Sequence, residues 1–121
     1  QKTVEYSKTR KQFGTVIGTF QALQHRMADM FIECQLARSI VVMAAMKLDS
    51  SADQREKTKA VSAAKSRVGK AIRRVSQEAV QIHGGIGVTN ELDVGHYFKR
   101  ATALEIMFGN TDYHVERFAS L

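Results

Sequence analysis

Two stretches of roughly thirty residues, each with the spacing of an amphipathic helix, constrain the fold more than any other feature of the sequence. In the first, residues 20–49, apolar or small side chains recur at Phe20, Leu23, Met27, Met30, Cys34, Ala37, Val41 and Ala44. In the second, residues 53–83, they recur at Val61, Ala64, Val68, Ala71, Val75, Ala79 and Ile82. Steps of three and four place each set on one face of a helix. We therefore predict two long helices that pack against each other.

The rest of the chain also favours helices. There is no proline and there are only 8 glycines in 121 residues, too few turn-forming residues for a β-rich fold. Asp53 followed by Glu56 has the pattern of a capping box, and Gly84-Gly85 would end the second long helix. Shorter helices are predicted at residues 1–10, 94–108 and 111–121, with a turn at Phe13-Gly14 and a loop over residues 84–93. The predicted fold is an all-α, antiparallel four-helix bundle.

Charge and cysteine content narrow the class of protein. The net charge of +6 leaves a nucleic-acid-binding bundle as an alternative, although the basic residues are spread along helical patterns rather than clustered. The single cysteine, Cys34, cannot form an internal disulfide, which is consistent with a reducing compartment and a cytoplasmic protein. No apolar run approaches the roughly 18 residues of a membrane span. Because the sequence starts with Gln1 inside a helical pattern, we expect it to be the cut end of a longer chain.

Three motifs carry a family resemblance. They are Tyr6-Ser7-Lys8-Thr9-Arg10-Lys11-Gln12-Phe13-Gly14, Ala79-Val80-Gln81-Ile82-His83-Gly84-Gly85-Ile86-Gly87, and Tyr97-Phe98-Lys99-Arg100 followed by Glu105-Ile106 and Phe108-Gly109. In this order and at these separations they resemble the C-terminal domain of acyl-CoA dehydrogenases, over essentially all of residues 1–121. The third motif and the segment after it look most like the small subunits of paired dehydrogenases, such as pimeloyl-CoA dehydrogenase.

The resemblance implies a function for the parent chain. Members of this family oxidise acyl-CoA to 2,3-enoyl-CoA with FAD bound at a subunit interface, and they pass the electrons to an electron-transferring flavoprotein. This domain would contribute to FAD binding and subunit assembly. Its partners would be the other domains of the same chain and a homo- or hetero-oligomer partner subunit, with no nucleic acid and no membrane. The isolated fragment is expected to bind little FAD and to be inactive.

The resemblance also implies site residues. Arg10 would contact the FAD pyrophosphate of a neighbouring subunit, with Gln12 and Phe13 close to it. The adenosine end of FAD would be lined by Gln81, Ile82, His83, Gly84 and Gly85. An arginine offers a fixed, always charged pair of donors, and glycines let a cofactor approach the backbone closely. Plainer interpretations stay open: Arg10 as a surface arginine, Phe13 as a core anchor, and His83 as a structural residue.

The sequence departs from the family at the catalytic base. Most members place a glutamate directly before the glycine of the third motif, where this chain has Phe108, which cannot accept a proton. Glu105 and Asp112 are weak candidates to replace it, so no catalytic residue is assigned and a base would lie before Gln1 or in a partner subunit. The alternative function is a helical protein-interaction module without a redox role.

Overall fold

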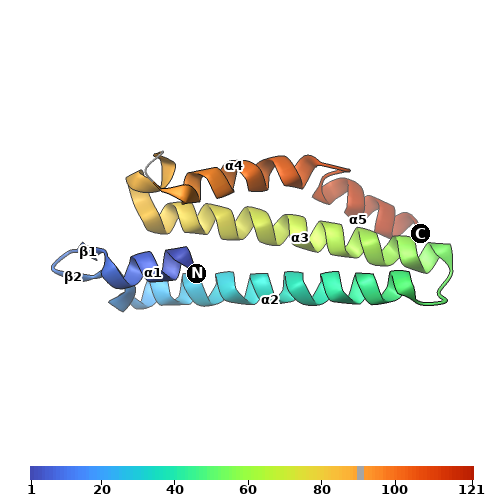
Figure 1. The fold of residues 1–121 in the computed structure, drawn as a ribbon, viewed down its shortest axis with the longest axis horizontal. Coiled ribbons are helices and arrows are strands. Elements are labelled where there is room, and N and C mark those ends of the chain that lie inside the picture. Colours follow the sequence, from blue (N-terminus) through green and yellow to red (C-terminus); the bar gives the residue numbers. More distant parts are fainter. Residues whose placement is uncertain (90–91) are drawn as a thin grey trace.

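The computed structural model describes residues 1–89 and 92–121 (Figure 1). Its elements are α1 (Lys2–Thr9), β1 (Lys11–Gln12), β2 (Thr15–Val16), η1 (Ile17–Thr19), α2 (Gln21–Asp49), α3 (Gln54–His83), η2 (Gly84–Val88), α4 (Asp93–Ile106) and α5 (Thr111–Ser120). The prediction of an all-α, antiparallel four-helix fold is confirmed within these residues, with α2, α3, α4 and α5 as the four main helices. None of the described helices is long and apolar enough to cross a membrane.

Helix α3 lies at the centre of the molecule. Figure 1 shows α2 running antiparallel along one side of α3, and α4 and α5 following each other along the opposite side. The short α1 lies beside α2 and α3 at the end where α3 finishes. This arrangement brings the first residues of the chain next to residues more than seventy positions later.

The packing of α3 requires small residues, as the sequence predicted. A Cβ added at Gly69 would lie 2.3 Å from Thr111 Oγ1, so a larger residue at position 69 would displace the Thr111 side chain at the start of α5. Ala60, Ala64 and Ala71 are also buried. The predicted cap of α3 is half formed: Asp53 Oδ1 accepts the Glu56 N–H at 2.7 Å, but the Glu56 carboxylate binds Lys47 on α2.

The buried face of α2 differs from the prediction at two positions. Cys34 and Val41 are exposed, as is Phe20 just before the helix, and Glu33 faces inward instead. The cause is electrostatic, because Glu33 reaches two arginines on α3, Arg67 at 2.6 Å and Arg74 at 3.3 Å. A search for apolar residues alone passes over a half-buried carboxylate that faces its ion-pair partners.

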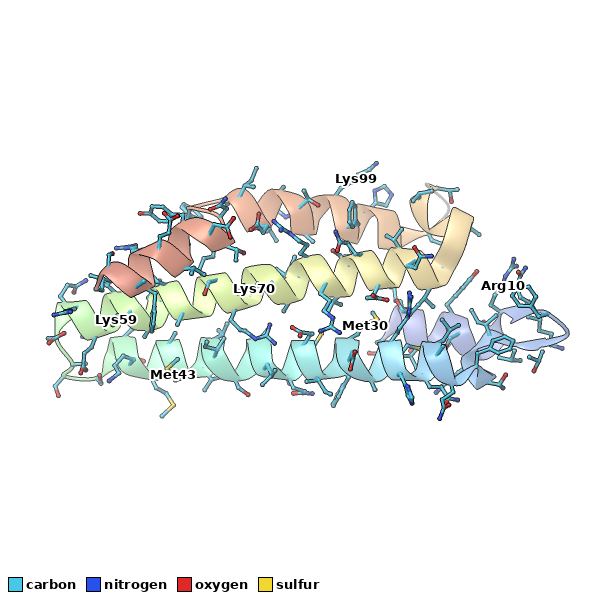
Figure 2. All side chains as sticks on the ribbon, turned by 180° about the vertical axis from the view of Figure 1, so that it is seen from behind. Arg10, Met30, Met43, Lys59, Lys70 and Lys99 are labelled. Atoms are coloured by element: carbon cyan, nitrogen blue, oxygen red, sulfur yellow. The ribbon has the colours of Figure 1, made fainter. Side chains whose placement is uncertain are left out.

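Large apolar side chains also cover the outer face of α2. In Figure 2, Met43 points away from α3, whereas Met30 points toward it. The exposed apolar residues of this outer face are Ile32, Leu36, Val41, Val42, Met43 and Met46. Helix α2 is therefore apolar on two sides, of which this chain covers one.

The connections hold two elements that the sequence did not predict. The predicted turn at Phe13-Gly14 joins two paired strands, β1 and β2, in a small hairpin. The predicted loop over residues 84–93 starts with the short 3₁₀ helix η2. Residues 90 and 91 of the predicted loop lie outside the described part of the structure. Helix α4 ends at Ile106 rather than at residue 108, the end predicted from the sequence.

Candidate functional site

All eight predicted cofactor-binding residues line one pocket. It has a volume of about 460 Å³ and lies where α1, the hairpin and the end of α3 meet. The lining residues are Tyr6, Arg10, Gln12, Phe13, Ile17, Leu23, Gln81, Ile82, His83, Gly84, Gly85 and Ile86. Two motifs that are seventy residues apart in the sequence thus form the two sides of one concavity.

Arg10 supplies a free positive charge to this pocket. It follows α1 directly, and its backbone is fixed on both sides: its N–H donates to Tyr6 O, and its carbonyl accepts the Ile17 N–H, both at 2.9 Å. Its guanidinium forms no ion pair with any carboxylate in the described part of the chain. Figure 2 shows Arg10 extending from the end of the molecule. A guanidinium without a carboxylate partner can bind an anion through two parallel hydrogen bonds.

Phe13 presents an aromatic ring at the mouth of the pocket. The side chain is 89% exposed, so the alternative that Phe13 anchors the core is wrong. Its backbone φ of 56° lies in the left-handed region, and with Gly14 at 79° it forms the kind of two-residue turn that closes tight hairpins. A bulky residue rarely adopts this conformation, and strain of this kind concentrates at functional sites.

Gly84 and Gly85 leave open space at the opposite side of the pocket. Gly84 ends α3 with φ 66° and ψ −148°, which confirms the predicted glycine cap. A Cβ added at either glycine would meet no described atom within 4 Å. The Gly84 N–H already donates to Gln81 O and Val80 O of α3, so it is not available to a ligand. The glycines therefore offer room for close approach rather than a free donor at Gly84.

His83 is held in place by its neighbours. The residue is 5% exposed, its Nδ1 lies 2.8 Å from Ala79 O, and its ring stacks on Tyr6 with 4.3 Å between centroids. These contacts confirm the structural interpretation of His83. Sequence reasoning did not assign Tyr6 to the pocket. The signal in the sequence was that Tyr6 stands in the first motif, four positions before Arg10.

The turn that carries Phe108 is built from buried polar contacts. Glu105 is 6% exposed and accepts the Thr111 N–H at 3.0 Å, which caps the start of α5. His114 Nε2 lies 3.0 Å from the Phe108 carbonyl oxygen, and Asn110 Oδ1 accepts the Tyr113 N–H at 2.9 Å. The Phe108 side chain is 87% exposed, at a backbone φ of 59°. These contacts fix the backbone and leave the ring of Phe108 outside the core.

Glu105 is poorly suited to act as a catalytic base. The hydrogen bond from the Thr111 backbone holds the pKa of the Glu105 carboxyl below its ordinary value of 4.5. The carboxylate also lies 3.5 Å from Arg73. Glu105 packs at Gly69, which is fourteen positions, or about 21 Å of helix, before His83 at the pocket. The Phe108 turn and the pocket are therefore separate parts of this chain.

The residues of the pocket suit an anionic ligand with a flat ring system. Arg10 provides the charge, Gln12 and Gln81 provide amide donors and acceptors, and Phe13 provides an aromatic face. The space above Gly84 and Gly85 lets the ligand reach the backbone. A nucleotide with a pyrophosphate group combines these properties.

Comparison with known proteins identifies the family. Residues 1–120 match the family model described as "Acyl-CoA dehydrogenase, C-terminal domain". The chain belongs to the acyl-CoA dehydrogenase family. This confirms the resemblance that the three motifs indicated.

Related acyl-CoA dehydrogenases and solved structures agree with this assignment. Acyl-CoA dehydrogenase IpdE2 of Mycolicibacterium smegmatis is 48% identical over 99 residues, which cover 82% of this chain and 29% of IpdE2. The ChsE4–ChsE5 complex from Mycobacterium tuberculosis superposes with a TM-score of 0.90 at 31% identity, over 98% of this chain and 32% of the other. An FAD complex of PigA superposes with a TM-score of 0.88 at 27% identity, over 98% of this chain and 30% of the PigA chain. The chain thus spans about a third or less of the length of these proteins.

Proposed function

We propose that this chain is the C-terminal domain of an FAD-dependent acyl-CoA dehydrogenase subunit, in which it helps to hold FAD and to assemble the enzyme. The observation that carries the proposal is the convergence of Arg10, Phe13 and Gly84-Gly85 on one pocket. Membership of the family adds the reaction class, the oxidation of acyl-CoA to 2,3-enoyl-CoA. The parent chain is accordingly an oxidoreductase, and the domain alone is inactive.

Each side of the pocket has a role toward the cofactor, which supplies the hydride acceptor of the reaction when bound. Arg10 pairs with the pyrophosphate, and Gln12 and Phe13 lie along the same nucleotide. Gln81 and the backbone from Ile82 to Gly85 line the adenosine end. Because this domain is about a third or less of the length of its relatives, the remainder of the FAD contacts come from other domains or a neighbouring subunit.

An apolar groove supports the proposal that other parts of the protein cover this domain. The groove has a volume of about 510 Å³ and starts beside Gln1, where α1 begins. It continues between α2, α3 and α4. Its lining residues include Met30, Cys34 and Ala37 of α2, Ala71 and Val75 of α3, and Val94, Tyr97 and Ala101 of α4. Exposed apolar surface of this kind marks contact with another segment or subunit. We take the 121 residues as the C-terminal domain of a longer chain, truncated on its N-terminal side.

Phe108 decides how such a subunit takes part in the reaction. An aromatic hydrocarbon ring cannot accept the α-proton of the acyl-CoA, so the subunit supports a catalytic partner or carries its base before Gln1. The exposed Phe108 ring makes little contribution to the fold of this chain, which is consistent with a role toward acyl-CoA or a partner subunit. Electrons would leave to an electron-transferring flavoprotein.

Flavin bleaching tests this function directly. The full-length protein is purified with its FAD content measured, then mixed anaerobically with a panel of acyl-CoAs, alone and with its partner subunit. Bleaching by the protein alone places the base before Gln1, and bleaching only with the partner makes this a supporting subunit. FAD present but never bleached by any acyl-CoA would contradict the reaction class.

The outer face of α2 favours a second candidate function, a helical interaction module without redox activity. Its exposed apolar residues fit a protein-binding surface as well as a subunit interface. The two functions are separated by cofactor content. A full-length assembly that purifies without flavin, and does not take it up on reconstitution, supports the interaction module.

A further inference from the structure

We propose that Tyr6 is a positioning residue of the cofactor pocket, holding Arg10 at a fixed place relative to Gly84-Gly85. This inference rests on the proposed function, because it assigns Tyr6 a role in FAD binding. Tyr6 acts through Arg10 and the end of α3, so its effect on FAD is indirect.

The pocket needs such a residue because its two sides come from separate elements. Arg10, Gln12 and Phe13 belong to α1 and the hairpin, whereas Gly84 and Gly85 follow α3. Helix α1 has only 8 residues, too few to be stable without tertiary contacts. A pyrophosphate contact by Arg10 depends on holding both sides at one separation.

Tyr6 contacts both sides at once. Its carbonyl accepts the Arg10 N–H at 2.9 Å, which fixes the start of the Arg10 segment. Its ring stacks on His83 at 4.3 Å with 29° between the ring planes, and its hydroxyl donates to His83 O at 3.4 Å. His83 is the residue directly before Gly84, so the stack reaches the glycine pair through one peptide bond.

His83 makes the contact rigid. Its Nδ1 lies 2.8 Å from Ala79 O, one turn back in α3, and the residue is buried. The His83 ring therefore cannot turn away without losing a hydrogen bond inside the protein. Tyr6 stacks on a fixed surface rather than on a mobile side chain.

The other contacts of α1 hold different parts of it. A Cβ added at Gly18 would lie 2.8 Å from Ser7 O, so Ser7 packs against η1. Lys2 pairs with Asp93 at the first residue of α1, on the exposed surface and two turns from Arg10. Neither contact sets the distance between Arg10 and Gly84.

The test is a double-mutant cycle on FAD affinity. Full-length apoprotein, with its partner subunit where one is required, is titrated with FAD for the wild type, Tyr6→Leu, Arg10→Ala and the double variant. Tyr6→Leu should weaken FAD binding by about ten-fold, the effect of losing one aromatic pair. The double variant should bind no more weakly than Arg10→Ala alone, because Tyr6 acts through Arg10.

Two further variants serve as controls. Tyr6→Phe keeps the stacking ring and should stay within about three-fold of the wild type, since the lost hydroxyl hydrogen bond is long. Phe118→Leu removes an exposed aromatic ring of α5 outside the pocket and should leave FAD affinity unchanged. If Tyr6→Leu does not fold, Tyr6→Met takes its place under the same criterion.

The outcomes separate this inference from the proposed function. Normal FAD affinity in Arg10→Ala removes the assignment of the pocket and the inference with it. A loss in Arg10→Ala, together with an unaffected Tyr6→Leu or with additive losses in the double variant, overturns the role of Tyr6 alone.

Discussion

Gly85 and Gly87 are separated by one residue, yet their surroundings differ. A Cβ at Gly85 would meet no described atom within 4 Å, whereas one at Gly87 would lie 2.9 Å from His83 Cβ and from Val80 O. We expect Gly85→Ala to leave the melting temperature of the apoprotein nearly unchanged and to weaken FAD binding, because the new methyl group occupies the pocket. Gly87→Ala should destabilise the fold by roughly 1–3 kcal/mol. Thermal melting and FAD titration check both, and normal FAD affinity in Gly85→Ala would speak against the cofactor site.

Phe108 is a position where a substitution can add chemistry without disturbing the fold. The backbone there is held by His114 and by the Glu105–Thr111 cap, while the ring is 87% exposed. If Phe108 stands where the family has its base, Phe108→Glu should increase flavin bleaching by acyl-CoA in a subunit that lacks it. Phe108→Gln is the matched control, with similar shape and no basicity. Equal behaviour of the two variants would show that position 108 does not face the substrate.

At the scale of elements, Glu33 joins α2 to α3 through Arg67 and Arg74. The hydrogen bond from Arg67 lowers the pKa of the Glu33 carboxyl below its ordinary value of 4.5. A lowered folded-state pKa gives stability that is complete above pH 4.5 and is lost as pH falls through the folded-state pKa. Glu33→Gln should lower the free energy of unfolding by about 1–3 kcal/mol at pH 7. Below pH 4.5 the variant should lose less stability than the wild type, because it has no carboxylate to protonate at this position. The control is Glu116→Gln, at an exposed glutamate of α5. Melting curves of both variants and the wild type are recorded from about pH 3 to 7, the range in which glutamate side chains ionise.

The helices were predictable because their period of 3.6 is local information. The orientation of α2 about its axis depends on contacts that are distant in the sequence. The two arginines that bind Glu33 lie 34 and 41 positions away. The sequence analysis therefore missed that Glu33 faces inward and that Cys34 and Val41 are exposed. The hairpin was missed for another reason, since Phe13 is an unusual residue for a position with positive φ. The eight pocket residues were found through the family motifs, whereas Tyr6 required the observed stack on His83.

At the scale of the whole molecule, apolar surface remains on two sides of α2: the groove beside Gln1 and the outer face around Met46, which is 69% exposed. A domain that spans 29% of IpdE2 in length is expected to have such surfaces where the rest of the protein packs. The isolated 121-residue chain should therefore be mostly helical and associate with itself as its concentration rises.

Charged substitutions on the outer face test which surface drives this association. Val42→Glu with Met46→Glu should shift the sedimentation of the isolated chain toward the monomer without lowering its melting temperature, since both side chains are at least half exposed. Val88→Glu, at an exposed apolar residue of η2, is the matched control and should leave association unchanged. Association that persists in the double variant would assign it to the groove, whereas a wild-type chain that is monomeric at all concentrations would refute the expectation. Dissociation by the double variant alone would make the outer face of α2 the surface that the full-length protein buries against its neighbours.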